Sequence, residues 1–500
     1  MIHVKIGMVQ NMVKVDDTKE NREKCLCNSC PSYPRNCDGE ILYCSLGKSC
    51  VDVHENGCIC YMCPVYFENK LDGLYYCDKE VVGESKTLMR KKKSDESKSF
   101  YQSMVDIKDM SNAGESVVRS MGSTKKMPFN WDDLHLIPAQ VFKIPLNHDE
   151  NVKTEIIIGP KAENPLKVSS PILISGLSFG AVSRKVRMII AHTAADLGIG
   201  FNSGEGGVLE EELKTSSEHI IVQYSTGRFG IDDEKLKKAA AIELRFGQGA
   251  YPGKGSYLPA SKITPEIAKI RGLQAAEAAY SPACHPDILN SEDIKKKVIE
   301  LRRISSNVPI GAKIGCGNIE KDVEVLVDSE VDFIAIDGFG GGTGATNLFV
   351  RENVGIPLIA ALPRAYNTLN EMDVKDDISL IAGGGLRNSA DFAKCLAMGA
   401  DAVYIGTSAL IAINCEQFRI CYTGKCPTGI TTQSPSLLNQ LNIEEGIKKL
   451  SNFIRVSNEE LASFTRIVGK NDISELNQDD LVSLNKDLAT LTGVKWLDGQ

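Results

Sequence analysis

Three cysteines near the C-terminal end have a spacing suited to metal chemistry. Cys415, Cys421 and Cys426 form a C-x5-C-x4-C pattern after a glycine-rich apolar run, with no fourth cysteine close behind. Three thiolates are one short of the usual zinc or four-iron site. The pattern therefore predicts an iron–sulfur cluster with three protein ligands, next to a strand end suited to phosphate binding. Three buried, inert thiols are the alternative interpretation.

Two copies of one cysteine-rich unit lie in the N-terminal part of the chain. Each reads C-x-C-x2-C-P-x-Y, and in each copy the first and last cysteines are 19 positions apart. Such a repeat is hard to obtain by chance. Four thiolates per copy suit either Zn2+ or a 4Fe–4S cluster, and two clusters can exchange ligands between copies, as in two-cluster ferredoxins. The candidate ligands are Cys25, Cys27, Cys30 and Cys44 in the first copy and Cys58, Cys60, Cys63 and Cys77 in the second.

The composition is that of a globular protein with little attraction for polyanions. The chain has 500 residues, of which 42% are hydrophobic and 24% charged, which is enough for a full-sized α/β barrel with appendages. A net charge of −8 provides no basic field for nucleic acid or anionic lipid. No apolar run approaches the ~20 residues of a membrane helix. Ten of the 16 cysteines lie between Cys25 and Cys77, and no apolar leader precedes them, so we expect a reducing, cytoplasmic setting.

Short apolar runs that end in glycine-rich turns follow one another from about residue 171. Clear examples are 172–176, 308–315, 331–338, 378–385 and 402–407, and others begin near 199, 220, 243 and 277. Continuous apolar strands that alternate with amphipathic stretches predict an α/β fold, a parallel (β/α)8 TIM barrel. Nine runs are one too many, so one is expected to be an insertion or hairpin. A doubly wound sheet is the alternative, but no G-x-G-x-x-G follows a first strand.

Four segments are expected along the chain. Residues 1–85 form the cysteine-rich domain, in which Cys37 and Cys50 have no counterpart in the second copy and are expected to be non-ligands. Residues 86–170 are a linker and adaptor segment, 171–433 the barrel with the three-cysteine loop, and 434–500 a C-terminal helical extension. In that extension apolar side chains recur from Ile443 to Ile454 at helical spacing.

Glycines at three of the expected strand ends predict a phosphate site. In (β/α)8 barrels phosphate is held after strands seven and eight, where glycines let backbone N–H groups come close. Arg387 adds a positive charge to one of these turns. Tight turns without a ligand are the alternative. The residues concerned are Gly341, Gly342, Gly384, Gly385, Gly406 and Thr407.

Between about 170 and 433 the chain resembles the FMN-containing synthase domain of glutamate synthase. The matching stretches are 174–180, 202–207, 225–230, 248–250, 341–345, 382–385 and 415–433. With its cysteine-rich start, the chain is most similar to the short archaeal-type enzymes. The resemblance implies that the C-x5-C-x4-C loop binds a 3Fe–4S cluster beside FMN. It also implies that ammonia and 2-oxoglutarate form an imine, which reduced FMN converts to L-glutamate.

The resemblance also implies roles for single residues. Glu205 would lie in the substrate pocket near the reacting carbon, and Lys313 would stabilise the reduced flavin near N1. Lys313 also ends an apolar strand, where a buried cation needs a partner. Contacts to the isoalloxazine ring would come from Ser178, Gly180 and Gln248.

This chain departs from the family at one informative position. Tyr251 stands where the family has a lysine expected to meet a substrate carboxylate, and Lys254 follows three positions later. A tyrosine does not replace the attraction of a cation for a dicarboxylate. His285 is the histidine expected near the site. A paralogue with another substrate, or an electron-relay subunit, therefore remains an alternative. A plain FMN oxidase or isomerase would not need the three-cysteine loop.

Nitrogen and electrons are expected to come from other proteins or from solution. Met1-Ile2-His3 lacks the N-terminal nucleophilic cysteine of a glutaminase, and no dinucleotide-binding fingerprint is present. Free ammonia or a separate glutaminase subunit would supply nitrogen, and ferredoxin or a reductase subunit would supply electrons. A homo- or hetero-oligomer is therefore expected.

Overall fold

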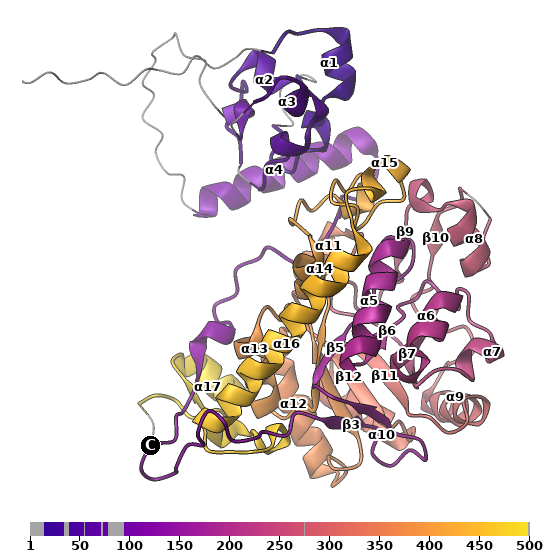
Figure 1. Ribbon diagram of the computed structural model, residues 1–500, viewed down its shortest axis with the longest axis vertical. Coiled ribbons are helices and arrows are strands. Elements are labelled where there is room, and N and C mark those ends of the chain that lie inside the picture. Colours follow the sequence, from indigo (N-terminus) through magenta and orange to yellow (C-terminus); the bar gives the residue numbers. More distant parts are fainter. Residues whose placement is uncertain are drawn as a thin grey trace, which may run out of the picture. The chain divides into compact units, whose positions relative to one another are not determined.

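The computed structural model describes residues 15–34, 40–54, 56–71, 74–78, 95–274 and 276–498, with only the backbone for 95–102. The chain divides into two compact units, Met1–Val117 with Gln417–Ile420, and Val118–Glu416 with Cys421–Gln500 (Figure 1). Cys37, the extreme N-terminus and the start of the linker at 86–94 lie outside the described residues, so the predictions made for them stay predictions.

Eight parallel strands close into a barrel in the second unit. Around the barrel the order is β5, β6, β7, β8, β11, β12, β14 and β15, and β15 pairs with β5. Every residue of β7 and β8 is buried, because helices cover the outside and side chains fill the inside. The predicted TIM barrel is confirmed, and the doubly wound alternative is wrong. The strands are β5 (Ile172–Ile174), β6 (Phe201–Asn202), β7 (Ile220–Ser225), β8 (Ala241–Arg245), β11 (Ile310–Gly315), β12 (Phe333–Asp337), β14 (Ser379–Gly383) and β15 (Ala402–Ile405).

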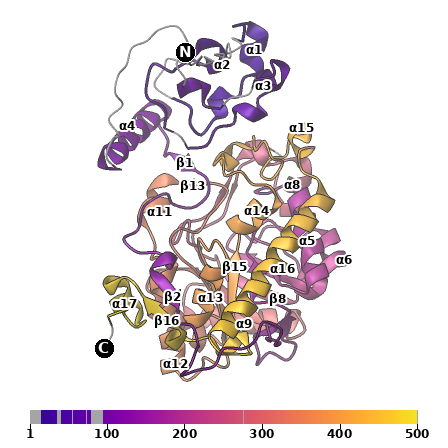
Figure 2. The ribbon, with the colours of Figure 1, turned by 60° about the vertical axis from the view of Figure 1, so that its left-hand side comes forward.

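Helices surround the barrel strands, as Figures 1 and 2 show. The longest helix, α16 (Ile443–Ile467), contacts α5, α13 and α14 and buries Leu450 and Ile454 among them. The expected helical extension therefore forms part of the barrel's outer layer. The other helices of this unit are α5 (Arg184–Leu197), α6 (Glu210–Ser216), α7 (Asp233–Leu236), α8 (Pro265–Arg271), α9 (Ser291–Ile304), α10 (Ile319–Asp328), α11 (Leu348–Asn353), α12 (Leu358–Glu371), α13 (Ser389–Ala397), α14 (Thr407–Ile413), α15 (Pro435–Leu438) and α17 (Lys486–Thr492).

Four short antiparallel pairs complete the second unit. The strand near 277 is β10 (Ala279–Tyr280), which pairs with β9 (Tyr257–Leu258) outside the barrel, so the ninth run is the expected hairpin. The C-terminal segment also contributes a strand, β16 (Leu481–Ser483), paired with β2 (Leu134–Leu136). The remaining pairs are β1 (Val118–Arg119) with β13 (Thr346–Asn347), and β3 (Ile156–Ile158) with β4 (Leu166–Val168).

The first unit consists of short helices around the cysteine repeat. Its α-helices are α1 (Lys19–Lys24), α2 (Tyr43–Leu46), α3 (Pro64–Glu68) and α4 (Asp95–Ala113). The two copies match in structure, because the 3-10 turns Cys27–Ser29 and Cys60–Met62 occupy equivalent positions. Phe418 and Ile420, from the segment of this unit within the C-x5-C loop, pack on Ile59. Among the described residues, no helix is both long and apolar enough to cross a membrane.

Candidate active site

A buried carboxylate lies inside the barrel. Glu243 of β8 is fully buried and accepts hydrogen bonds from the side-chain amides of Asn202 and Gln223, both at 2.8 Å. The Tyr404 hydroxyl donates to its other oxygen at 3.0 Å. These donors come from β6, β7 and β15, so the network connects strands across the barrel interior. With its bonds made, Glu243 is a structural group rather than a reacting one.

One step further along β8, Arg245 forms a buried ion pair with Glu205. The Arg245 Nη2 atom is 2.8 Å from Glu205 Oε2, and the two side chains are 3% and 12% exposed. Ser281 Oγ donates to the same oxygen at 2.7 Å, and Ser256 donates to the other. Burial favours a higher pKa for Glu205, but Arg245, Arg271 and the serine hydroxyls outweigh it and lower the pKa. Glu205 is therefore an ionised, fixed carboxylate at neutral pH.

Tyr251 also lies against this arginine. Its hydroxyl is 3.4 Å from Arg245 Nη1, and the residue is only 4% exposed. Burial and the charge of Glu205 raise the pKa of Tyr251, so the phenol stays neutral. Lys254 is exposed. The Arg245 Nε atom is buried and makes no hydrogen bond within the described part of the chain. The buried cation beside Tyr251 is thus Arg245, which keeps a donor available.

His285 contacts the backbone at the end of β8. Its Nε2 is 3.1 Å from the carbonyl oxygen of Arg245, and its Nδ1 is 3.1 Å from Arg228 Nη2. The ring stacks on Tyr224 and is 1% exposed. Burial and the Arg228 charge lower the pKa of His285 to about 4. A neutral ring that accepts at Nδ1 from the guanidinium must carry its proton on Nε2, which then donates to the carbonyl. His285 therefore positions the end of β8.

Lys313 lies beside Arg245 on the neighbouring strand, since the two are partners in the β8–β11 register. Its Nζ atom is 3.7 Å from Asp337 Oδ2 and 5.3 Å from the centre of the Tyr404 ring. The side chain is 5% exposed. Arg245, Lys313 and Asp337 thus end the adjacent strands β8, β11 and β12 at the C-terminal mouth of the barrel, where βα-barrel enzymes carry their chemistry. Glu205 reaches Arg245 from the loop after β6.

The three predicted glycine turns meet at this mouth. A Cβ on Gly384 would lie 2.6 Å from the backbone nitrogen of Gly338, and Gly384 has φ +115. A Cβ on Gly342 would lie 2.7 Å from Thr407 Oγ1. A Cβ on Gly341 would lie 2.9 Å from Asp337 Oδ1, close to Lys313. The turns after β12, β14 and β15 therefore lie close together and form one cradle, in which Gly384 packs against the backbone of Gly338 and leaves no room for a Cβ.

The other predicted cofactor contacts lie in different surroundings. Arg387 binds Asp391 and Asp132, and these carboxylates raise its pKa, so its charge is already engaged. Gly180 has φ +101 and faces Leu258. Two further residues, Ser178 and Gln248, are half-buried in the loops after β5 and β8.

The three-cysteine loop follows α14 in the second unit. The Cys415 N–H donates to the Leu410 carbonyl at 2.9 Å. The fully buried Lys262 donates to the Cys421 carbonyl at 3.2 Å, and its charge acts on both Cys421 and Cys426. Burial acts to raise the pKa of Cys426, but hydrogen bonds from Thr428 and Thr431 lower it. Burial and the neighbouring Cys426 raise the pKa of Cys421, so of these two thiols only Cys426 has a favoured thiolate, the form that a metal requires.

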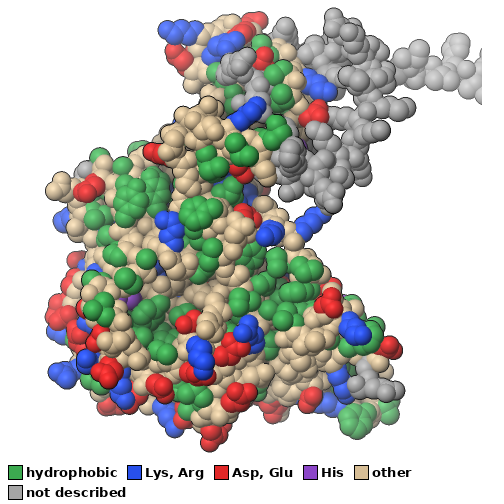
Figure 3. Space-filling view, turned by 180° about the vertical axis from the view of Figure 1, so that it is seen from behind, with side chains coloured by type: hydrophobic (Ala, Val, Ile, Leu, Met, Phe, Trp, Pro, Cys, Tyr) green, Lys and Arg blue, Asp and Glu red, His purple; other side chains and the backbone are tan. Residues whose placement is uncertain are grey.

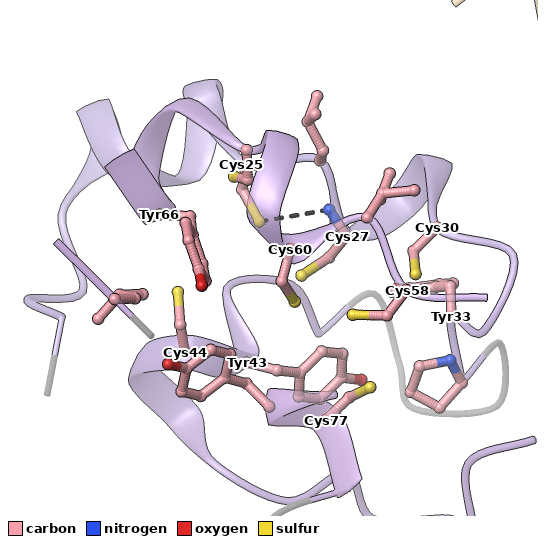
Figure 4. A pocket seen from close by; sticks show the side chains of 16 residues that line it. Cys25, Cys27, Cys30, Tyr33, Tyr43, Cys44, Cys58, Cys60, Tyr66 and Cys77 are labelled. Carbon is pink, nitrogen blue, oxygen red and sulfur yellow. Dashed lines mark hydrogen bonds between the residues drawn. The ribbon is translucent and has the colours of Figure 1, made fainter. Parts of the chain in front are cut away.

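In the first unit all eight repeat cysteines line one pocket (Figure 4). None of these eight forms a disulfide, whereas Cys50 takes part in one. Tyrosines at 33, 43, 66 and 76 complete the lining together with apolar side chains. No three His, Cys, Asp or Glu side chains of the described ranges converge as a single-ion site requires.

Several residues of the barrel mouth are missing from the sequence-based set. Arg245 is the most important, and it carried the same signal as Lys313, a charge at the end of an apolar run. Asp337 carried that signal too, at the end of the run from Phe333. Ser256 and Ser281 had no such signal, because their contact joins positions 25 residues apart. On the face seen in Figure 3, basic and acidic side chains of the described residues are interspersed.

Known proteins match both parts of the chain. A conserved region of glutamate synthase matches residues 102–471. The archaeal glutamate synthase (NADPH) of Methanocaldococcus jannaschii is 36% identical over 78% of this chain and 83% of its own length.

The chain belongs to the glutamate synthase family.

Other members of this oxidoreductase family include a glutamate synthase large subunit-like protein of Rhizobium meliloti, 33% identical over 79% of this chain and 95% of that protein. The archaeal-type glutamate synthase (NADPH) of Thermotoga neapolitana is 37% identical over 69% of this chain and 68% of that protein. Residues 25–78 match a separate protein family of unknown function, DUF2769. Among solved structures, a mutant flavocytochrome b2 with benzoylformate has a TM-score of 0.46 and 17% identity, covering 73% of this chain and 78% of that one.

Proposed function

We propose that this member of the glutamate synthase family is an FMN- and iron–sulfur-dependent enzyme that forms L-glutamate from 2-oxoglutarate and ammonia. The observation that carries the proposal is the barrel mouth, where a glycine cradle, Lys313 with Asp337, and Arg245 with Glu205 occupy neighbouring strand ends. When bound, FMN would supply the hydride that reduces the imine carbon.

The glycine cradle fits the phosphate of FMN. Its glycine turns lie at three strand ends, and the positive φ of Gly384 and Gly385 is of the kind that lets backbone N–H groups approach a phosphate. Lys313, held by Asp337 within the same mouth, would place a positive charge near the flavin ring. Ser178, Gly180 and Gln248 would contact the isoalloxazine ring. Arg387 would add only a weak attraction for the phosphate, because its charge is shared with two carboxylates.

Arg245 would take the place of the missing family lysine. Its buried guanidinium has a free Nε donor beside Tyr251, so it can bind one carboxylate of 2-oxoglutarate while Tyr251 donates its hydroxyl proton. Glu205, ionised and fixed by two serines, would orient the imine nitrogen and balance its positive charge. His285 would act indirectly, by holding the Arg245 carbonyl. Lys254 remains a proposed contact at the substrate entrance.

Electrons would reach the barrel through iron–sulfur clusters. Cys415, Cys421 and Cys426 would bind a 3Fe–4S cluster, and the cysteine repeat would bind two 4Fe–4S clusters. The middle of the three-cysteine loop packs, within the first unit, on Ile59, which lies between two repeat cysteines. The external donor would be ferredoxin or a reductase subunit, and a separate glutaminase subunit is one source of ammonia.

The test is anaerobic turnover of the full chain after reconstitution with FMN, iron and sulfide. With reduced methyl viologen, 2-oxoglutarate and ammonium, we expect stoichiometric L-glutamate. FMN bound at one per chain, with no glutamate from 2-oxoglutarate but reduction of a monocarboxylic 2-oxo acid with ammonium, would identify a paralogue. The buried Tyr251 is the observation that favours this second function.

Cluster reduction and flavin reduction without turnover of any 2-oxo acid would instead identify an electron-relay subunit. Arg245→Met should raise KM for 2-oxoglutarate by about 10- to 150-fold while it keeps its flavin.

A further inference from the structure

The two cysteine-rich copies do not each close on themselves. The thiol of Cys63, in the second copy, donates to the carbonyl of Lys24, the residue before the first cysteine of the first copy, at 3.9 Å. The thiol of Cys30, in the first copy, donates to the carbonyl of Gly57, the residue before the first cysteine of the second copy, at 3.8 Å. The third cysteine therefore crosses to the other copy in both directions.

Contacts among the thiols follow the same division. The Cys63 thiol lies within hydrogen-bonding reach of Cys25. Cys63, Cys25 and Cys44 also pack in one apolar cluster. Three cysteines of this group thus come from positions one and four of the first copy and position three of the second.

The other end of the cavity has the complementary arrangement. Cys60 lies within hydrogen-bonding reach of Cys58. Figure 4 shows Cys30, Cys58 and Cys77 toward one end of the cavity and Cys44 toward the other. The second position of each copy, Cys27 or Cys60, lies between the two ends (Figure 4).

We propose that the first unit holds two 4Fe–4S clusters whose ligands are exchanged between the copies. One cluster is bound by Cys25, Cys27, Cys44 and Cys63, and the other by Cys30, Cys58, Cys60 and Cys77. The proposal gives a metal-binding role to the segment that matches a family of unknown function. It rests on the proposed function only for the kind of metal centre.

The surroundings suit clusters better than single ions. The Cys27 N–H donates to Cys25 Sγ at 3.4 Å, and the Tyr75 N–H donates to Cys58 Sγ at 3.1 Å. Such bonds to sulfur stabilise cluster ligands and adjust their reduction potentials. A zinc ion would draw four sulfurs to about 2.3 Å of one point, whereas no three such ligands of the described ranges converge in that way and all eight thiols line one shared pocket.

Exchange also explains how so small a segment folds. A domain of this size rarely stabilises itself with an apolar core, and metal binding supplies the missing free energy. When every cluster draws on both copies, neither copy can fold alone, and the pair becomes one cooperative unit.

Two double variants of the full chain distinguish exchanged from separate ligand sets. After anaerobic reconstitution, Cys44→Ser with Cys63→Ser should lose about four irons, because both residues serve one cluster, and leave the electron paramagnetic resonance signal of the second cluster unchanged. The matched double, Cys44→Ser with Cys30→Ser, should perturb both signals. The reverse pattern would overturn the exchange.

Single variants keep the test decisive if both doubles fail to fold. Cys44→Ser and Cys63→Ser should alter the same resonance signal, and Cys30→Ser the other. A wild-type chain that binds two zinc ions, with no resonance signal abolished by these variants, would refute the clusters themselves. Glutamate formation with reduced dye, which enters at the flavin, is a separate readout, so its failure and that of the ligand exchange are distinguishable.

Discussion

Replacing Arg245 with methionine tests whether the barrel mouth binds a dicarboxylate. The substitution keeps the apolar length of the side chain and removes the guanidinium that lies between Glu205 and Tyr251. Loss of one charge-assisted hydrogen bond to substrate costs about 1.5–3 kcal/mol, or about 10- to 150-fold in KM for 2-oxoglutarate. Arg245→Lys should recover part of this loss, because it restores the charge without the planar fork.

The same substitution leaves Glu205 buried and unpaired. Removing one partner of a buried pair costs about 3–5 kcal/mol, and the two serine hydroxyls place the expected value at the lower end. In the wild type the lowered pKa of Glu205 stabilises the fold above pH 4–5. Without Arg245 burial raises that pKa, so the variant should lose stability as pH rises toward neutrality. Adding Glu205→Gln should restore most of it.

The assay combines steady-state kinetics with thermal unfolding, and the control is a second buried pair. Lys470 and Asp480 are 12% and 7% exposed and lie in the C-terminal segment, outside the proposed substrate site. Lys470→Met should lower the unfolding temperature without raising KM. If Arg245→Met behaves in the same way, with KM for 2-oxoglutarate unchanged, Arg245 has only a structural role and the argument for a dicarboxylate fails.

Three further outcomes follow from the site. Lys313→Met should lower the reduction potential of the bound flavin, because it removes a cation, only 5% exposed, that would stabilise the reduced flavin anion. An unchanged potential in a spectroelectrochemical titration would contradict this. His285 has a pKa lowered to about 4 against about 6.5 unfolded, so the unfolded state binds more protons, and the chain should lose up to about 3 kcal/mol as pH falls from 6.5 through 4. His285→Phe should flatten that slope in urea titrations. Gly384→Ala should abolish FMN binding because its Cβ would meet the backbone of Gly338. The control is Gly253→Ala, a position with positive φ and no atom within 4 Å of the added Cβ, which should only reduce stability slightly. Equal flavin affinity in the two variants would contradict the proposed role of the glycine cradle.

The barrel was predictable because its signal is local. Apolar runs with glycine-rich ends recur along the chain, and a continuous apolar run of this length indicates a parallel strand that is covered on both faces. Lys313 was found in the same way, as a charge at a strand end. Arg245 has the same signal, but a charge at a strand end does not by itself indicate that it will lie beside Tyr251, six positions later. Its partner, Glu205, is 40 positions away, and no periodicity connects them.

The sequence by itself determined the class of fold, the family, and the three-cysteine and four-cysteine motifs, since these depend on spacing along one chain. Only the tertiary structure decided which cation lies beside Tyr251, that the three glycine turns form one cradle, and that Cys30 and Cys63 cross to the opposite copies. The physical reason is that spacing specifies how a segment folds locally. Strand register and the packing of distant loops specify which segments meet, and both are properties of the whole domain.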